Sequence, residues 1–460
     1  MADLVKVWQK RGGKLLIGEA AHDNTPRLQE ATARRTQELQ QIANGLLPTV
    51  LLTERDSIEF LAGLLAAAAI GAPIVLANPQ WVESDWQQVA RLVEPNCVWG
   101  DCPIVPSSAA TNAVRGSVMI PTGGSSGEIR LAMHTWRSLT ASVRGFQTYF
   151  GQSQINSVCV LPLHHVSGLM QFWRGYVTGG TLAIAPFKSI QAGLRPAVDP
   201  ATCFLSFVPT QLQRLLDSAI PFRERCAIPF PLRCAIDWLK QFHTVLLGGA
   251  PAWPELLDRA QALQIRLAPT YGMTETASQI ATLRPDGFLQ GRRSCGVVLP
   301  HAEIQCDAIE PLQIRARSLC LGYYPNFFPS DAPFVPDDLG YFDALGELHI
   351  VGRSSSKIIT GGENVFPAEV EAAIWATKLV KDVCVFGLPD RDWGEVVTAA
   401  CVLANADSSI DRLQQLVSAQ LVPFKRPKRW IVLDTLPRNA QGKLNLAQLK
   451  TAIFDRQTAS

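Results

Sequence analysis

Residues 119–135 read MIPTGGSSGEIRLAMHT, in which a run of Gly, Ser and Thr at Thr122–Gly127 separates two apolar segments. Such a run is too flexible for a strand and too polar for a core. It offers backbone N–H groups and hydroxyls that can wrap phosphate oxygens, and Arg130 adds a fixed positive charge. The GxxxxGK[ST] pattern of a P-loop is absent, and a surface turn rich in Gly and Ser is the alternative interpretation. The predicted phosphate-binding residues are Thr122, Gly123, Gly124, Ser125, Ser126, Gly127 and Arg130.

Short apolar runs recur along the chain, and longer helical patterns lie between many of them. Examples of the runs are VCVLPL, TLAIAP, CFLSFVP, HTVLLGGA and ELHIVG, and examples of the helical patterns are PTQLQRLLDSA and WPELLDRAQALQ. Strands that alternate with helices indicate parallel α/β layers. A chain of 460 residues is also too long for one ordinary core, so at least two domains are expected.

The composition and the hydrophobic pattern of the sequence change after about residue 350. A polar segment, GRSSSKIITGGENVFPAEVEAAIW, leads into a shorter unit of strand-like VCVFGLP and VVTAACVLA, the helix SIDRLQQLVSAQL and strand-like RWIVLD. About a hundred residues suffice for a small α+β domain. We therefore predict an α/β fold with a large domain over residues 1–353 and a small α+β domain over residues 354–460.

Composition restricts the class of protein. Apolar residues make up 47% and charged residues 18% of the chain, which is typical of a globular protein, and the formal net charge of +2 does not favour a nucleic-acid partner. The chain has eleven cysteines, an odd number, and none of them forms a CxxC pair. This pattern does not favour a disulfide framework or a zinc site, so reduced and mostly buried thiols are expected. The first residues lack the apolar core of a signal peptide, and the chain is expected in the cytoplasm.

One stretch, FLAGLLAAAAIGAPIVLA at residues 60–77, approaches the length of a membrane span. Gly71 and Pro73 interrupt it where a helix would end and a strand would begin. We therefore expect a buried helix followed by the buried strand PIVLA, and no integral membrane segment.

Three further motifs carry groups that suit a nucleotide. APTYGMTETAS, residues 268–278, offers an aromatic ring, hydroxyls and a carboxylate that can hold Mg²⁺. PDDLGYFDALGELHIVGR supplies Asp338, whose carboxylate suits ribose hydroxyls, although a β-hairpin with charged turns is the plain alternative. PRNAQGKLN contains Lys443, which on its own reads as a solvated residue of a basic tail.

Taken together and in order, these motifs resemble those of the adenylate-forming superfamily, which includes acyl-CoA synthetases, peptide-synthetase adenylation domains and luciferases. The segments that carry the resemblance, over residues 50–450, are TGGSSGEIR, YGMTE, PDDLG, GRSSSKIITGGENVFPAEVE and PRNAQGK. LPLHHVSGLMQFWRGYVTGGTLAI and LSFVPTQLQRLL look closest to the o-succinylbenzoate–CoA ligases of menaquinone and phylloquinone biosynthesis.

The chain departs from the superfamily pattern in places. Arg130 stands where the phosphate loop ordinarily has lysine, and Ile129 stands where it has proline. Arginine keeps the positive charge and gains a planar fork, so phosphate binding is expected to survive. The pair TG before Asp338 is missing, and Ser355 stands at the predicted hinge in place of an aspartate, which puts the energetics of hinge rotation in doubt.

The resemblance implies a reaction in two halves. A carboxylate first attacks the α-phosphate of ATP to give an acyl-adenylate and pyrophosphate, and the thiol of coenzyme A then displaces AMP. ATP and coenzyme A are thus expected as co-substrates, with Mg²⁺ as cofactor and a small-molecule acid as the third reactant. Such a reaction depends on electrostatic positioning and on exclusion of water, without a covalent enzyme intermediate.

The resemblance also implies roles for individual residues. The Gly/Ser loop with Arg130 holds the β- and γ-phosphates, Thr274 the α-phosphate and Glu275 the Mg²⁺, while Lys443 reaches the transition state from the small domain, which acts as a lid. The nucleotide-binding set is completed by Gly248, Gly249, Ala250, Pro251, Tyr271, Gly272, Asp338 and Arg353. The substrate-binding set is His164, His165, Arg174 and Ser278, and Gly361 and Gly362 are expected at the coenzyme A channel.

Other readings of the sequence remain open at this point. His164 and His165 are equally consistent with structural histidines, and no third ligand lies near them in the sequence to make a metal site. A Mg²⁺-dependent kinase or ATPase lacks its signatures here. A nucleotide-binding module without activity, or a benzoate or fatty-acid CoA ligase, would share most of the motifs. The sequence does not decide the oligomeric state.

Lys443→Ala is expected to abolish adenylation, because a desolvated positive charge at the α-phosphate contributes roughly 3 kcal/mol or more to the transition state. The thioester half-reaction, started from supplied acyl-adenylate, is expected to continue nearly unchanged. The measurement is the rate of each half-reaction in the variant and the parent. Equal losses in both halves would contradict the assignment of Lys443 to the adenylation step.

Overall fold

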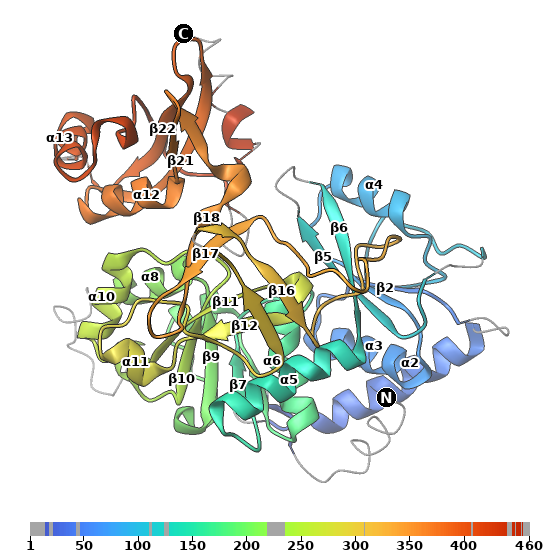
Figure 1. The fold of residues 1–460 in the computed structure, drawn as a ribbon. Helices are drawn as coiled ribbons and strands as arrows, with labels where there is room; N and C mark the ends of the chain where they lie inside the picture. The colour runs from blue at the N-terminus through green and yellow to red at the C-terminus, as the bar shows by residue number, and fades with distance from the viewer. Residues whose placement is uncertain are drawn as a thin grey trace.

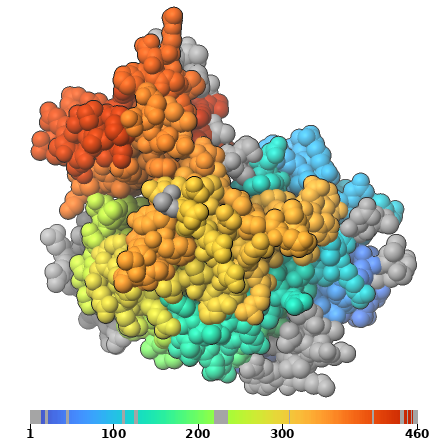
Figure 2. Space-filling model, in the orientation of Figure 1, coloured from blue at the N-terminus to red at the C-terminus, as the bar shows by residue number. Residues whose placement is uncertain are grey.

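The computed structural model describes residues 14–17, 22–42, 47–109, 113–123, 128–218, 235–307, 309–405, 408–438, 444–446, 448–451 and 453. A large N-terminal domain carries most of the chain, and a smaller C-terminal domain stands on one side of it (Figures 1 and 2). The expected α/β fold class with a small α+β domain is confirmed. The domain limit at residues 353 and 354 stays a prediction.

An eight-stranded sheet forms the largest layer of the N-terminal domain. Its order is β1-β8-β7-β9-β10-β11-β12-β13, parallel from β1 to β11 and antiparallel from β11 onward. The strands are β1 (Leu16–Ile17), β7 (Asn156–Cys159), β8 (Leu182–Ile184), β9 (Cys203–Phe207), β10 (Thr244–Leu247), β11 (Leu267–Met273), β12 (Ser278–Thr282) and β13 (Val297–Val298). The expected strands VCVLPL, TLAIAP, CFLSFVP and HTVLLGGA are confirmed in this sheet, where β-branched and other apolar side chains fill its buried faces.

A second sheet of five strands has the order β4-β2-β3-β5-β6. Its strands are β2 (Val50–Leu52), β3 (Ile74–Leu76), β4 (Cys97–Trp99), β5 (Ser117–Gly123) and β6 (Ile129–Thr135). The expectation that the Gly/Ser run is not strand is wrong at its start, because β5 continues through Thr122 and Gly123. Antiparallel pairing with β6, with Thr122 opposite Arg130, supplies the backbone hydrogen bonds that the small side chains do not specify.

Helices cover the two sheets and pack with them into a shared core. The main core takes residues from β2 and β7 and from α3, α5 and α6. The helices of this domain are α2 (Thr25–Ile42), α3 (Ser57–Ile70), α4 (Glu83–Leu92), α5 (Trp136–Phe150), α6 (Val166–Thr178), α7 (Phe187–Gln191), α8 (Pro209–Ser218), α9 (Ala235–Lys240), α10 (Pro254–Ala262) and α11 (Pro285–Leu289), with 3₁₀ turns at Pro200–Thr202 and Thr274–Thr276. The apolar stretch at residues 60–77 is the buried helix α3 followed by β3, as expected. Asp56 caps the start of α3, and Gly71 ends it with φ of 78°.

Two small antiparallel sheets complete the N-terminal domain. One pairs β14 (Ala302–Gln305) with β16 (Gln313–Ala316), and the other has the order β15-β17-β18. The strands of the second are β15 (Glu310–Pro311), β17 (Asp338–Phe342) and β18 (Leu348–Arg353). The hairpin β17–β18 is the one that the sequence allowed, and its register sets Asp338 opposite Arg353.

The C-terminal domain combines a five-stranded sheet with helices, in agreement with the expected α+β unit. Its strand order is β20-β19-β22-β21, with β23 parallel to β22. The elements are β19 (Ile358–Thr360), β20 (Glu363–Val365), α12 (Pro367–Ala376), β21 (Val380–Asp390), β22 (Gly394–Leu403), α13 (Ile410–Gln420) and β23 (Arg429–Val432), with 3₁₀ turns at Ser354–Ser356 and Pro423–Lys425. α12 and α13 close one core of this domain over the sheet.

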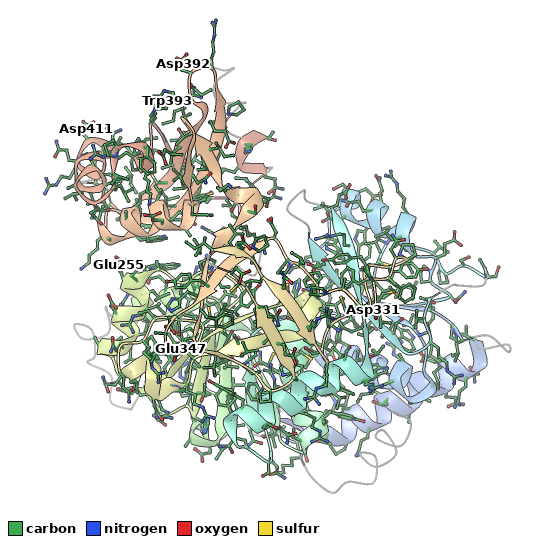
Figure 3. The ribbon with its side chains drawn as sticks, in the orientation of Figure 1. Glu255, Asp331, Glu347, Asp392, Trp393 and Asp411 are labelled. Carbon is green, nitrogen blue, oxygen red and sulfur yellow. The ribbon has the colours of Figure 1, made fainter. Side chains whose placement is uncertain are left out.

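A pair of tryptophans joins the two domains. Trp253 precedes α10 of the large domain, and Trp375 lies in α12 of the small one. Their rings stack with centroids 4.6 Å apart and planes 8° from parallel. Glu255, in the first turn of α10, lies below α12 (Figure 3), whereas Trp393 lies at the far end of the small domain. The end of α12 that carries Trp375 is therefore the part of the small domain that rests on α10.

The structure also bears on the cysteines and on membrane-spanning helices. In the described part of the chain every cysteine is free, and Cys97, Cys159, Cys203 and Cys320 are among the buried ones, as expected. No helix built from the described residues is both long and apolar enough to span a bilayer.

Acid is expected to destabilise the N-terminal domain through His134 and His301. Both side chains are buried, and burial lowers the pKa of each from 6.5 to about 4. The unfolded chain therefore binds protons that the folded chain excludes, so the stability that is present above pH 6.5 falls as the pH falls toward 4. For each histidine the loss between pH 6.5 and 5 is roughly 2 kcal/mol. Urea unfolding at a series of pH values measures it.

The matched variant for this test is His301→Phe, which keeps a ring beside Gly145 but removes the titrating group. It is expected to flatten the acid slope of the N-terminal domain relative to the parent. The comparison with the parent is needed because Glu371, half-buried in the C-terminal domain, acts in the opposite direction: desolvation raises its pKa to about 7. An unchanged slope would show that His301 is not a source of the acid sensitivity.

Candidate active site

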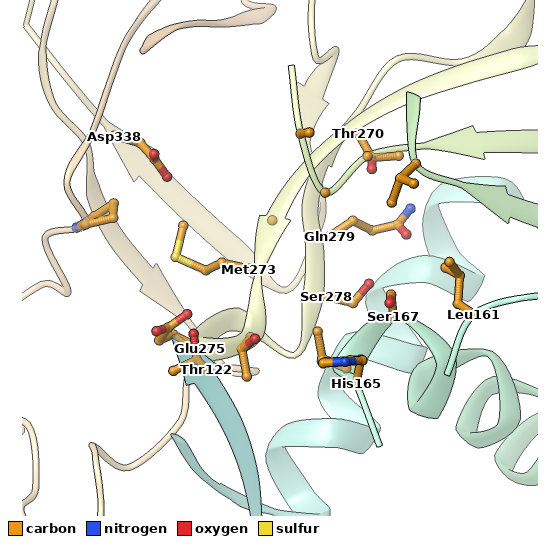
Figure 4. Close-up of a pocket in the computed structure, with 18 of the residues that line it drawn as sticks. Thr122, Leu161, His165, Ser167, Thr270, Met273, Glu275, Ser278, Gln279 and Asp338 are labelled. Carbon is orange, nitrogen blue, oxygen red and sulfur yellow. The ribbon is translucent and has the colours of Figure 1, made fainter. Parts of the chain in front are cut away.

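A cleft of about 340 Å³ opens where the ends of both sheets meet the β17–β18 hairpin. Asp338 lies at one end of it, Thr122 and Glu275 lie together at another, and His165, Ser167 and Gln279 line the wall beside α6 (Figure 4). The predicted residues that the structure brings to this cleft are Thr122, Gly123, Arg130, His165, Arg174, Gly248, Gly249, Ala250, Gly272, Thr274, Glu275, Ser278, Asp338 and Arg353. Residues from most of the length of the N-terminal domain therefore converge on one site.

The Asp338 carboxylate is fixed from two sides. Tyr271 donates its hydroxyl proton to Oδ2 at 2.8 Å, and Arg353 donates from Nε to Oδ1 at 3.1 Å. Burial and the neighbouring carboxylate raise the pKa of Tyr271, so its hydroxyl stays protonated and remains a donor. Each carboxylate oxygen keeps a lone pair free, which suits the two hydroxyls of a ribose. Tyr271, predicted for an adenine slot, is thus directed at Asp338.

A loop glycine opens the cleft between β10 and β11. A Cβ at Gly248 would lie 2.5 Å from Oγ1 of Thr270, so only glycine lets the two segments approach this closely. Gly249 follows in the left-handed region with φ of 82°. The narrow slot predicted here for a planar base thus has a backbone wall along one side.

Glu275 and Arg130 are linked by a residue that the sequence analysis did not select. Tyr323 donates its hydroxyl proton to Oε1 of Glu275 at 2.6 Å. The guanidinium of Arg130 lies over the ring of the same tyrosine, 4.2 Å from its centroid. The ring thus holds a carboxylate and a cation at neighbouring points on the cleft wall. Such a pair suits a polyphosphate with its metal ion.

Arg174 is buried in the wall of the cleft beside α6. Its side chain is 2% exposed, and burial lowers its pKa to about 9, so it remains charged at neutral pH. Nη2 donates to Oε1 of Gln279 at 3.1 Å and to Oγ of Ser278 at 3.3 Å, and the guanidinium lies over Phe146. Within the described residues its side-chain hydrogen-bond partners are neutral, no carboxylate pairs with it, and Nε has no acceptor. The guanidinium therefore lies inside the wall and does not reach the surface.

The two histidines of HHVSG lie at the entrance to α6 with ring centroids 4.3 Å apart. His165 lines the cleft and His164 does not, and burial lowers the pKa of His164 to about 4. No cluster of three or more His, Cys, Asp or Glu side chains suited to a metal ion forms within the described part of the chain.

Four further predicted residues in the described part of the chain do not line the cleft. Pro251 follows the loop that lines it, and Ser355 lies in the 3₁₀ turn between the domains, where its N–H donates to Asp337 Oδ1 at 3.1 Å. Gly361 and Gly362 form the tip of the β19–β20 hairpin with φ of 59° and 84°, next to Trp393. Four residues of the phosphate loop, Gly124 to Gly127, and Lys443 lie outside the described residues.

Comparison with known proteins gives the fold and site a family. Residues 103–308 match the AMP-binding enzyme family, and residues 369–443 match the AMP-binding enzyme C-terminal domain. A 2-succinylbenzoate–CoA ligase from Bacillus licheniformis is 30% identical over 445 residues, which cover 88% of this chain and 89% of that protein. The chain belongs to the AMP-binding enzyme family. The resemblance to adenylate-forming enzymes is thereby confirmed.

Two further comparisons agree with this membership. A 2-succinylbenzoate–CoA ligase from Listeria monocytogenes is 32% identical over 335 residues, which cover 72% of this chain and 68% of that one. The solved structure of o-succinylbenzoate coenzyme A synthetase from Bacillus subtilis, in complex with ATP and magnesium ion, has a TM-score of 0.81. It is 23% identical and the match covers 97% of this chain and 99% of that chain, so it shows the shared fold.

In this AMP-binding enzyme, the sequence analysis missed several lining residues, including Tyr323, Gln279 and Ser167. Tyr323 is 48 residues from Glu275 in a segment without a motif, and Gln279 directly follows the last selected residue of its segment. Ser167 lies in the apolar segment after the two histidines. Only Gln279 had a signal, because a polar residue at an inward position of a buried strand suggests a partner.

Arg130→Ala is expected to raise the KM for ATP well above that of the parent, because it removes the positive charge beside Tyr323. Arg130→Lys keeps the charge and is expected to retain activity within about tenfold. Steady-state kinetics with ATP varied measures both. Tyr323→Phe is the matched control: it keeps the ring under Arg130 and removes only the hydroxyl bound to Glu275. An alanine variant with the ATP kinetics of the parent would place the phosphate site elsewhere.

Proposed function

We propose that this chain is an ATP-dependent acid–CoA ligase that converts 2-succinylbenzoate into its coenzyme A thioester through an acyl-adenylate. Relatives of that name cover most of the chain, and a nucleotide-sized cleft carries the groups that the reaction needs. The observation that carries the choice of acid is Arg174, a buried cation without a carboxylate partner among the described residues.

The first half-reaction joins the acid to AMP. A carboxylate oxygen attacks the α-phosphorus of ATP, the bond to the bridging oxygen breaks, and pyrophosphate leaves with the electron pair. Arg130, exposed at the cleft mouth, would hold the departing phosphates together with Thr122 of β5. Thr274 would donate to the α-phosphate, and Asp338 would fix the ribose. The side chains position charge and need not take up a proton.

Glu275 is the residue that would hold Mg²⁺. Its side chain is 6% exposed at the cleft. Oε1 accepts a hydrogen bond from the Tyr323 hydroxyl, and no donor among the described residues contacts Oε2. One carboxylate, phosphate oxygens and water make a suitable ligand set, because Mg²⁺ keeps several waters and few protein ligands. When bound, the ion supplies charge neutralisation for the phosphate groups.

The second half-reaction transfers the acyl group. The thiol sulfur of coenzyme A attacks the acyl carbon of the adenylate, the bond from that carbon to the phosphate oxygen breaks, and AMP leaves. The glycines expected at the coenzyme A channel, Gly361 and Gly362, lie here on a hairpin outside the cleft. We therefore infer that the second step takes place with the C-terminal domain turned about the Ser354–Ser356 segment.

The acid suits the pocket because it carries two carboxylates. The succinyl carboxylate is activated, so the aromatic carboxylate enters the cleft wall still charged. A buried charge is costly unless it is paired. Arg174 would supply that pairing, with Ser278 and Gln279 holding the guanidinium in place. An acid with a neutral tail would leave the cation unpaired, so the site would disfavour aryl or fatty acids that lack a second carboxylate.

The chemistry also fits a compartment and a set of partners. We propose that the enzyme acts in the cytoplasm, where thiols stay reduced and ATP and coenzyme A are available. Its partners in this proposal are three small molecules: the acid, ATP and coenzyme A.

Arg174→Ala is expected to lower kcat/KM for 2-succinylbenzoate by an amount equivalent to roughly 2–5 kcal/mol, while the KM for ATP changes little. The measurement is ATP–pyrophosphate exchange with each substrate varied in turn. Arg174→Lys keeps the charge without the planar fork, so its loss should be intermediate.

A second substrate separates pairing from packing in this test. 4-Oxo-4-phenylbutanoate has the same skeleton without the aromatic carboxylate. The parent should strongly prefer 2-succinylbenzoate over it, and Arg174→Ala should abolish most of that preference. If the variant kept the preference, Arg174 would not recognise the carboxylate; if the parent had none, another aryl or fatty acid would be the substrate. If none of the acids tested supported ATP–pyrophosphate exchange, the chain would be a nucleotide-binding module without activity.

A further inference from the structure

The turn that presents Thr274 and Glu275 to the cleft is strained. Thr274–Thr276 form a single 3₁₀ turn between β11 and β12. The two residues that follow, Ala277 and Ser278, have φ of 52° and 82°, in the left-handed region that residues with a Cβ rarely adopt. Strain of this kind persists only where the surrounding structure fixes the backbone in several ways.

Four consecutive carbonyl groups of this turn receive a hydrogen bond from a different part of the domain. Their donors come from β6, from α5 and from the segment after β16. The pairs are His134 Nε2 to Thr274 O at 2.7 Å, Cys320 N to Glu275 O at 2.8 Å, Ser318 Oγ to Thr276 O at 2.8 Å and Ser142 Oγ to Ala277 O at 2.8 Å. Three of the four donors are side chains. The shape of the turn is therefore set by side chains from distant segments that pack around it, and not by the residues of the turn alone.

His134 makes the shortest of these bonds and joins the turn to the strand of Arg130. Its side chain is fully buried, and burial keeps it neutral. A carbonyl oxygen only accepts, so Nε2 must carry the proton, and Nδ1 is left to face Oγ of Ser138 at 3.1 Å. Both ring nitrogens are thus occupied and the tautomer is defined by its surroundings. β6 carries Arg130 four residues earlier, on the strand that pairs with Thr122.

We propose that His134 is a positioning residue for adenylation: its Nε2–H holds the Thr274 carbonyl, and thereby fixes Thr274 and Glu275 relative to the phosphate-binding hairpin β5–β6. This role rests on the proposed function, in which those two residues meet the α-phosphate and Mg²⁺. His134 itself does not line the cleft, so it acts only through the turn. Groups that orient a metal-binding carboxylate typically change metal affinity or activity by about 10- to 100-fold when they are lost.

Amide side chains of two lengths test this geometry. The amide nitrogen of glutamine reaches as far as Nε2 of histidine, whereas that of asparagine reaches only as far as Nδ1. His134→Gln is therefore expected to keep the bond to Thr274 and most of the exchange activity, and His134→Asn to lose about 10- to 100-fold in kcat for ATP–pyrophosphate exchange. The KM for the acid should change little, because Arg174 is also held by Gln279, which lies beyond the turn in β12.

A binding measurement separates positioning from general stability. The shift in melting temperature is measured with ATP and Mg²⁺ and with ATP and a chelator, and the difference is the Mg²⁺-dependent part. His134→Asn should lose that part and His134→Gln should keep it. The matched control is Tyr149→Phe, which removes a buried hydrogen bond to the Thr282 carbonyl away from the cleft. It should lower the melting temperature of the free protein and leave the Mg²⁺-dependent shift intact.

Several outcomes would overturn the proposal. A folded His134→Gln protein without the Mg²⁺-dependent shift would do so, as would His134→Asn with the shift and exchange rate of the parent. If His134→Asn does not fold, Ser318→Ala, which removes the neighbouring bond to Thr276 O, takes its place and must weaken the same shift. Absence of exchange in the parent with every acid tested would reject the proposed function instead, which keeps the two failures distinct.

Discussion

The Asp338 carboxylate is the point at which the separate parts of the N-terminal domain are joined. Through Tyr271 it is bound to β11 of the eight-stranded sheet, and through Arg353 to the last strand before the small domain. A carboxylate with 8% exposure would be unfavourable without these charge-assisted donors. A sugar bound to Asp338 would therefore contact the strand that leads directly into the C-terminal domain.

The cleft contains two arginines that meet opposite electrostatic conditions. Arg130 lies at the mouth, where solvent screens its charge. A multiply charged group can therefore bind and depart, because the cation that stays behind is hydrated and not buried. Arg174 lies in the wall with neutral neighbours, where its charge is weakly screened and an incoming anion is strongly preferred. The first arrangement suits a leaving group, and the second suits discrimination between acids.

The fold class and the identity of about half of the cleft residues were predictable because they depend on local patterns. Apolar runs bounded by Gly and Pro predicted the strands and α3. The motifs around Thr122, Glu275 and Asp338 predicted these residues together with the cleft residues next to them in the sequence. The assignment of Gly123 to a loop failed because strand pairing with β6 overrides a weak local preference.

Contacts between distant segments were beyond sequence reasoning. Tyr323 and His134 reach the Glu275 turn from segments 48 residues after it and 140 residues before it, and neither belongs to a motif that names its partner. Their positions follow from the packing of whole elements. The same holds for Ser355, whose partner Asp337 precedes β17, and for the final position of the hairpin that carries Gly361.

The stacked indoles of Trp253 and Trp375 have an optical consequence. Parallel rings 4.6 Å apart share their electronic excitation, so the pair absorbs and emits differently from two separate indoles. One ring belongs to each domain, and the chain between them turns at Ser354–Ser356. A rotation of the small domain moves one chromophore off the other. Such a rotation would therefore change the circular dichroism and fluorescence of the unlabelled protein.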